Sequence, residues 1–150
     1  MLRIFFAIAM IAIGVNASLA QQDVIKERKQ LMRENGNQAK LGSEMARGEK
    51  PFDLAAARKI FAQFEQTATR AATLWPQNSM DQSTADDPYS SSPKIWESME
   101  DFRTRLAKFG SDSKTAGESV KDLDSFKSAF TDIGKNDCGG CHEKYRLKKG

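Results

Sequence analysis

The stretch DLAAARKIFAQFEQTATRAATLWP, residues 53–76, sets the fold class of this 150-residue chain. Its apolar side chains recur at alternating steps of three and four residues, at Leu54, Ala57, Phe61, Phe64, Ala68, Ala71 and Trp75. This spacing is typical of an amphipathic helix that buries one face. Asp53 is a suitable N-cap. Pro76 is expected to end the helix, because proline disfavours helical geometry in the residue before it.

Two later segments repeat this helical pattern. One begins with Ser92-Pro93, a cap followed by proline at the first helical position, and is expected to end at Gly117. Its apolar residues are Ile95, Trp96, Met99, Phe102, Leu106 and Phe109. The last segment, which Asp122 is expected to cap, continues to Leu147. Its apolar residues are Val120, Leu123, Phe126, Phe130 and Ile133.

The first helical segment, about residues 23–48, is less regular, because Arg28 and Asn35 interrupt its apolar face. Short linkers at 48–52 and 117–121 favour antiparallel neighbours, and the polar stretch 76–93 is expected to form a crossover loop. Strand patterns are nearly absent. The sequence therefore predicts an all-α protein, an antiparallel up-down four-helix bundle whose core can hold a cofactor between facing helices.

The N-terminus has the pattern of a secretory signal. Arg3 precedes an uncharged run from Ile4 to Val15, and Ser18-Leu19-Ala20 offers small residues for cleavage. We expect cleavage after Ala20, which leaves residues 21–150 as one periplasmic domain with no membrane segment. The formal charge of +3 falls to +2 when Arg3 is removed. So weak a charge, without a basic aromatic stripe, gives no support for nucleic-acid binding.

The motif Cys138-Gly139-Gly140-Cys141-His142 contains both cysteines and the only histidine of the chain. C-x-x-C-H is the pattern for covalent haem attachment, in which both thiols bond the macrocycle and the imidazole ligates iron. On a helix, residues i, i+3 and i+4 share one face, so all three side chains can reach one flat ring. The sequence predicts one haem c, attached near the C-terminus.

Two other interpretations of the motif remain. A redox dithiol is usually found in a βαβ context, which this sequence lacks. A zinc site normally needs four ligands, and here three fall within five residues.

The second axial position of the iron decides the function. After position 20, the candidate protein ligands are Met32, Met45, Met80 and Met99, and an open site is the alternative. Met99 fits an apolar stripe, Met45 suits the core or its rim, and Met80 is in the polar loop. Met32 is on the irregular face of the first segment, close to the small residue Gly36. Periodicity alone leaves ligation and core packing both open for it.

Several motifs resemble the class II cytochromes c, the cytochrome c′ family of four-helix bundles. They are the haem motif followed by Tyr145-Arg146, the first-segment stretch from Arg28 to Met32, and Pro93-Lys94-Ile95-Trp96 with Phe102. The stretches 30–36, 48–51 and 89–96 are most similar to the low-spin cytochrome c-556 subgroup. That resemblance implies Met32 as distal and His142 as proximal iron ligand. It also implies that Arg28 and Arg146 lie beside the haem.

These residues imply a one-electron carrier and not an enzyme, with periplasmic redox donor and acceptor proteins as partners. Trp75, Trp96, Phe126 and Phe130 are candidate walls of the haem pocket. A basic tail formed by Lys144, Arg146, Lys148 and Lys149 is a candidate docking surface for acidic partners. The main rival is a five-coordinate haem module that binds nitric oxide or carbon monoxide, and a dithiol oxidoreductase is the second. The resemblance also leaves a homodimer open.

Overall fold

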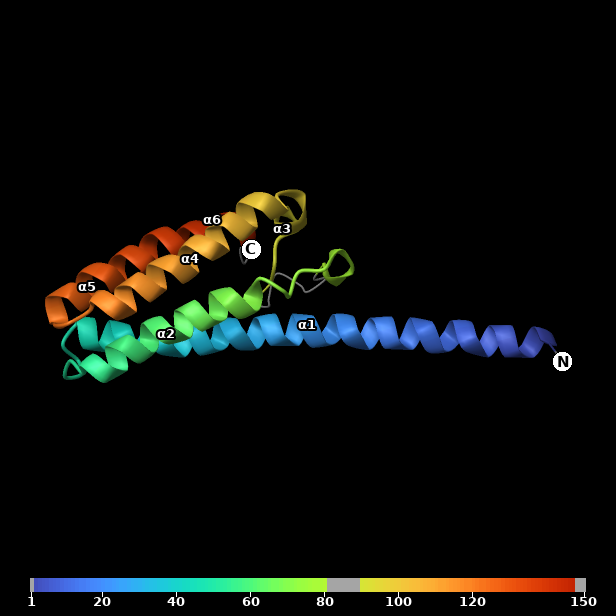
Figure 1. Cartoon of the computed structure of the whole chain (residues 1–150), viewed down its shortest axis with the longest axis horizontal. Coiled ribbons are helices and arrows are strands. Elements are labelled where there is room, and N and C mark those ends of the chain that lie inside the picture. The colour runs from blue at the N-terminus through green and yellow to red at the C-terminus, as the bar shows by residue number, and fades with distance from the viewer. Residues whose placement is uncertain (1, 81–89, 148–150) are drawn as a thin grey trace.

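The computed structural model describes the backbone of residues 2–80 and 90–147, with side chains from residue 22 onward. Its helices are α1 (Leu2–Ala46), α2 (Leu54–Ala71), α3 (Lys94–Glu97), α4 (Met99–Ser119), α5 (Leu123–Asp132) and α6 (Gly140–Tyr145). A 3-10 turn, η1 (Gln77–Ser79), follows α2, and a π-helical segment, η2 (Ile133–Gly139), joins α5 to α6. This is the predicted four-helix bundle. Its helices are α1, α2, α3 with α4, and α5 continued by η2 and α6, in alternating directions (Figure 1).

Helix α1 begins at Leu2, whereas the sequence pattern predicted a start near Asp23. The predicted signal segment is rich in Ala, Ile and Leu and contains no proline, so nothing interrupts the helix between the two parts. The helix then extends far beyond the other helices (Figure 1). Among the described residues, no helix has a stretch long and apolar enough to cross a membrane.

The turn between α1 and α2 has the geometry of a Schellman motif. Gly48 has a φ of +75°, which favours glycine, and its N–H donates to the Met45 carbonyl at 3.1 Å. The Glu49 N–H donates to the Glu44 carbonyl at 2.9 Å. These two bonds satisfy carbonyls that the end of a helix leaves open. The chain therefore reverses within a short linker, as predicted, and α2 packs along α1.

Both predicted aspartate caps are confirmed. The Asp53 carboxylate accepts a hydrogen bond from the Ala56 N–H at 2.7 Å. Asp122 accepts one from the Ser125 N–H at 2.8 Å, and the Ser125 hydroxyl in turn accepts from the Asp122 N–H at 3.1 Å. This reciprocal pair is a capping box, and it fixes the start of α5.

Two helix ends differ from the prediction. Helix α2 ends at Ala71, five residues before Pro76, and Leu74 then makes a tighter i→i+3 bond to Ala71. Leu74 nevertheless stays buried, so the apolar pattern continues beyond the helix itself. The predicted third helix is interrupted at Ser98, where φ is −131° and ψ is 48°, and it ends at Ser119 instead of Gly117. Of the predicted crossover loop, residues 81–89 lie outside the described residues.

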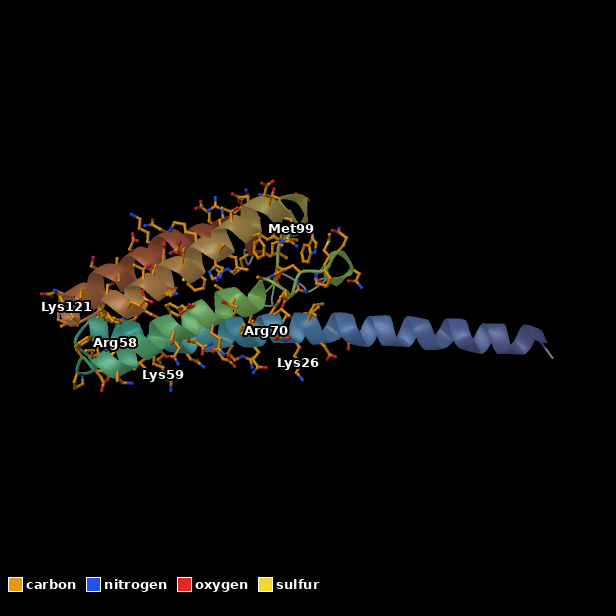
Figure 2. The ribbon with its side chains drawn as sticks, in the orientation of Figure 1. Lys26, Arg58, Lys59, Arg70, Met99 and Lys121 are labelled. Carbon is orange, nitrogen blue, oxygen red and sulfur yellow. The ribbon has the colours of Figure 1, made fainter. Side chains whose placement is uncertain are left out.

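The core is built mainly where α2 packs against α4. Phe61 and Phe126 are fully buried and lie with their ring centroids 5.7 Å apart. One turn further along α2, Phe64 packs against Phe109 of α4, with ring centroids 5.7 Å apart. On the outer side of the α1–α2 pair, Arg70 forms an ion pair with Glu27, and Figure 2 shows Arg70 where α2 runs along α1.

Candidate functional site

A cavity of about 320 Å³ lies between α1, α2, α4 and α6. Its volume falls within the usual range of ligand pockets, about 300–1,000 Å³. All six site residues predicted from the sequence line it, namely Arg28, Met32, Cys138, Cys141, His142 and Arg146. The fold thus brings the first helix and the C-terminal motif, which are far apart in the sequence, to one site.

Burial sets the protonation of the two thiols. It raises the pKa of Cys138 to about 11 and also raises the pKa of Cys141. Both thiols therefore stay protonated near neutral pH. A redox dithiol needs a thiol whose pKa is lowered, because its nucleophile is the thiolate. This environment argues against the dithiol interpretation.

The imidazole of His142 has the protonation state that a metal ligand requires. Burial lowers its pKa, and the charge of Arg146 lowers it further. The ring is therefore neutral near pH 7, with a nitrogen lone pair available for coordination. His142 is in the first turn of α6, next to Cys141.

The spacing of the haem motif predicts that it lies on one α-helix, but in the structure the motif is divided between two helical segments. Cys138 is in the π-helical segment η2, whereas Cys141 and His142 are in α6. Such π-helical segments occur often at functional sites. A Cβ at Gly139 would lie 3.3 Å from the Gly134 carbonyl oxygen, so glycine relieves a close approach within this segment.

Of the four described methionines after position 21, Met32 alone lines the cavity. Met45 is 2% exposed and belongs to the core, as expected. Met80 follows η1, and Met99 lies at the start of α4, near the end of the bundle (Figure 2). Met32 comes from α1, whereas the thiols and the imidazole come from η2 and α6.

Arg28 is 5% exposed, although it carries a full charge. Its guanidinium Cζ lies 4.3 Å from the centroid of the Trp75 ring and 5.6 Å from that of Trp96. Its Nη2 donates a hydrogen bond of 2.6 Å to the Ser79 carbonyl. Cation–π contact and the hydrogen bond hold this charge at the cavity wall, where it can meet an anionic group.

Arg146 lies just beyond α6 and is exposed at the edge of the cavity. It forms an isolated antiparallel bridge with Ser91. On either side of it, the Ser92 N–H donates to the Tyr145 carbonyl at 2.9 Å and the Leu147 N–H donates to the Ser90 carbonyl at 3.1 Å. The chain after the haem motif is thus bonded to the end of the crossover, and both segments border the cavity.

The apolar walls of the cavity are only partly those predicted. Trp75 lines it, as expected, together with Leu31, Phe64, Ile95, Phe102, Leu106 and Phe109. Trp96 is outside the lining and packs edge-on against Trp75, at 5.7 Å between centroids. Phe126 and Phe130 pack toward the opposite end of the bundle, where Phe126 contacts Phe52 and Phe61. The periodicity predicted correctly which face of each helix is buried, but it did not predict at which end of the bundle each aromatic side chain lies.

Sequence reasoning missed a polar cluster that fixes α6 to α4. The Asp101 carboxylate accepts hydrogen bonds from the Tyr145 hydroxyl at 2.5 Å, Lys144 Nζ at 2.9 Å and Arg105 Nε at 2.9 Å. These three donors, with Tyr145 first, hold the pKa of Asp101 well below its usual range. Tyr145 and Arg105 also line the cavity. Only the i, i+4 pair of Asp101 and Arg105 was detectable in the sequence.

Asp137 was also missed. It precedes Cys138, lines the cavity, and has a side chain that is 2% exposed. Its Oδ1 accepts a hydrogen bond from Lys108 Nζ at 2.8 Å. Burial raises the pKa of Asp137, and the hydrogen bond from Lys108 opposes that rise. A single acidic residue before a cysteine carries no periodic signal, so its position could not be recognised from the sequence.

The residues around the cavity fit a haem c. Two thiols and a neutral imidazole lie along one wall, a thioether lies on another, and aromatic and aliphatic side chains complete the lining. Two arginines, Arg28 and Arg146, also line the cavity. Within the described residues, no group of three or more His, Cys, Asp and Glu side chains is arranged to hold a bare metal ion.

Comparison with known proteins agrees with this chemistry. The family model described as Cytochrome C' matches residues 23–146. Cytochrome c-556 of Rhodopseudomonas palustris is 37% identical over the full length of both chains, and cytochrome c' of the same organism is 31% identical over 148 residues, 99% of this chain and 98% of the relative.

Solved structures show the same fold. An NMR-validated structural model for oxidized R. palustris cytochrome c556 superimposes with a TM-score of 0.75 at 39% identity, covering 86% of this chain and 99% of the other. Cytochrome c' from the same organism gives a TM-score of 0.76 at 30% identity and covers 85% and 98% of the two chains. This chain therefore belongs to the cytochrome c′ family, whose cofactor is covalently attached haem c.

Proposed function

We propose that this protein is a periplasmic one-electron carrier in which His142 and Met32 ligate the iron of one haem c, bound through Cys138 and Cys141. The observation that carries the proposal is the position of Met32. It faces the same cavity as His142 but comes from α1, and the other described methionines after position 21 lie outside that lining.

The bound haem supplies a one-electron Fe(III)/Fe(II) couple. The neutral imidazole of His142 and the soft thioether of Met32 favour the ferrous state, so His/Met ligation raises the reduction potential. The apolar walls exclude water and act in the same direction. Arg28 and Arg146 offer guanidinium groups to the haem propionates. If His142 and Met32 both hold the iron, an external ligand would have to displace one of them, which would favour electron exchange over gas binding.

The second candidate is a five-coordinate haem c that binds nitric oxide or carbon monoxide. The similarity to a cytochrome c', at 31% identity, supports it. In that case Met32 would be an apolar cover over an open iron site. The two candidates differ in spin state, so one spectrum separates them.

The test is the optical spectrum of the exported protein in both redox states. We expect a low-spin ferric form with a weak iron–sulfur band in the red, and slow uptake of carbon monoxide by the ferrous form. Met32→Ala should turn the ferric iron high-spin and open it to carbon monoxide. Met99→Ala, a matched loss of a half-buried methionine outside the cavity, should leave the spectrum unchanged.

Three results would contradict this proposal in different ways. A high-spin wild type that takes up carbon monoxide at once on reduction would establish the gas-binding candidate. A low-spin Met32→Ala variant would show that another group is the distal ligand. Free thiols and no haem, in protein matured with its export machinery, would favour the dithiol oxidoreductase.

The periplasmic location depends on removal of residues 1–20. The family model begins at residue 23, and the solved cytochrome c556 chain, almost fully matched, covers 86% of this chain. Both observations are consistent with a mature chain that starts at Gln21. Intact-mass measurement of the periplasmic protein should give residues 21–150 plus one haem. Sedimentation of the same sample tests for a homodimer.

A further inference from the structure

We propose that the buried carboxylate of Asp137 is a potential-setting group, which lowers the reduction potential of the haem by stabilising the ferric state. This inference rests on the proposed electron-carrier function and assigns a new residue to its regulation. A negative charge near the iron favours the oxidised form, because that form carries one more positive charge.

The geometry places Asp137 at the cofactor. It lines the same cavity as His142, and it directly precedes Cys138, one of the two attachment residues. Its side chain is 2% exposed, so water screens its charge poorly. Among the described residues, its buried Oδ2 has no hydrogen-bond partner. A carboxylate oxygen in this position has a direct electrostatic influence on a group bound in the cavity.

Lys108 compensates this charge only in part. Its Nζ contacts Oδ1 of Asp137 at 2.8 Å, and it also bonds the carboxylate of Asp112 on the same helix. The lysine side chain is 56% exposed, so its charge is screened more strongly than that of Asp137. One lysine is thus shared between two carboxylates. Lys108, Asp112 and Asp137 together carry a net negative charge, and Asp137, the buried member of the three, lines the cavity.

Other charged groups near Asp137 add to the same field. Asp112 from α4 and Asp132 from the end of α5 both contribute repulsion that favours the protonated carboxyl. Lys108 provides the opposing attraction, and its hydrogen bonds to Asp112 and Asp137 raise the pKa of the lysine. Lys108 therefore stays charged through the neutral range and supports an ionised Asp137.

The experiment is a spectroelectrochemical titration of the holoprotein at neutral pH. Asp137→Asn should raise the potential and change the redox equilibrium constant about three- to tenfold toward the ferrous form, which is about 30–60 mV for a one-electron couple. Asp137→Glu keeps the charge and should give a potential close to that of the wild type. Asp112→Asn is the matched control, because it removes a partly exposed charge that contacts the same lysine but lies outside the cavity lining.

An Asp137→Asn variant with an unchanged or lower potential would overturn the proposal. So would an Asp112→Asn variant that shifts the potential as much as Asp137→Asn does. If the asparagine variant does not incorporate haem, Asp137→Ser tests the same loss of charge with a smaller side chain. The spin state, read in the same spectra, reports separately on ligation by Met32. A failure of the proposed carrier function is therefore distinguishable from a failure of this inference.

Discussion

Replacing Gly42 by alanine tests the packing of α1 against α5. A Cβ at Gly42 would lie 2.4 Å from Cε2 and 2.7 Å from Cζ of Phe130, which is closer than carbon atoms can approach. The Phe130 ring, which is partly buried, stacks on Phe126 with centroids 5.2 Å apart, so making room for the new methyl group disturbs that stack. Overpacking of this kind costs about 1–3 kcal/mol. The gain in helix propensity from Gly to Ala returns about 1 kcal/mol.

We therefore expect Gly42→Ala to lower the free energy of unfolding by up to about 2 kcal/mol. With a urea m-value of about 2 kcal/mol/M, the unfolding midpoint should fall by up to roughly 1 M. The measurement is urea denaturation of the ferric holoprotein, followed by far-UV circular dichroism.

Gly117→Ala in α4 is the matched control. Its Cβ would meet Cβ of Phe61 at 3.4 Å, an ordinary contact, so propensity should dominate and the variant should be as stable as the wild type or more so. In the double variant Gly42→Ala/Phe130→Leu, the shorter side chain should recover part of the lost stability. If Gly42→Ala raises the midpoint by itself, α1 and α5 are farther apart than described.

Three further predictions concern the caps, the polar cluster and the basic tail. Asp122→Ala should cost about 1 kcal/mol of stability, seen as a lower urea midpoint, because the capping box at α5 is lost. Asp101→Asn should lower the urea midpoint at pH 7. Because the pKa of Asp101 is lowered from 3.8 on folding, the difference in urea midpoint between the wild type and the variant should shrink as the pH falls below about 4. A difference that does not change with pH would refute this stabilising role of the ionised carboxylate. Replacing Lys144, Lys148 and Lys149 by Gln should slow electron transfer to an acidic partner more at low than at high ionic strength. Equal slowing at both ionic strengths would reject docking by the basic tail. Residues 148–150 of this tail lie outside the described residues.

The repeating features of the fold could be predicted from the sequence. The stripe from Leu54 to Ala71 fixed the buried face of α2, and the aspartates at 53 and 122 marked two helix starts correctly. The haem motif was recognisable because its cysteines and histidine must be close in sequence to reach one ring. These features depend on neighbours within one or two turns, which local spacing describes well.

Features that depend on tertiary contacts were not predictable. The break at Ser98 and the π-helical segment before Cys138 have no marker in the apolar pattern. Phe126 and Phe130 were predicted to line the cofactor pocket, although Phe126 packs with Phe52 and Phe61 away from it and Phe130 stacks on Phe126. Asp137 could be recognised only from the structure, in which Lys108 of α4 lies beside it. In each case the decisive neighbour lies on another element or at another level of the bundle.

The pairing of residues 90–92 with residues 145–147 has a consequence for the order of assembly. A chain is synthesised from its N-terminus, so α1, α2 and α4 exist before the two thiols and the imidazole do. The hydrogen bonds that join Ser92 to Tyr145 and Leu147 to Ser90 can form only when the end of the chain has been made. Haem can therefore attach only after the C-terminal part of the chain has been synthesised. Shortening the C-terminus by a few residues would remove the hydrogen bonds that join it to residues 90–92 at the border of the pocket.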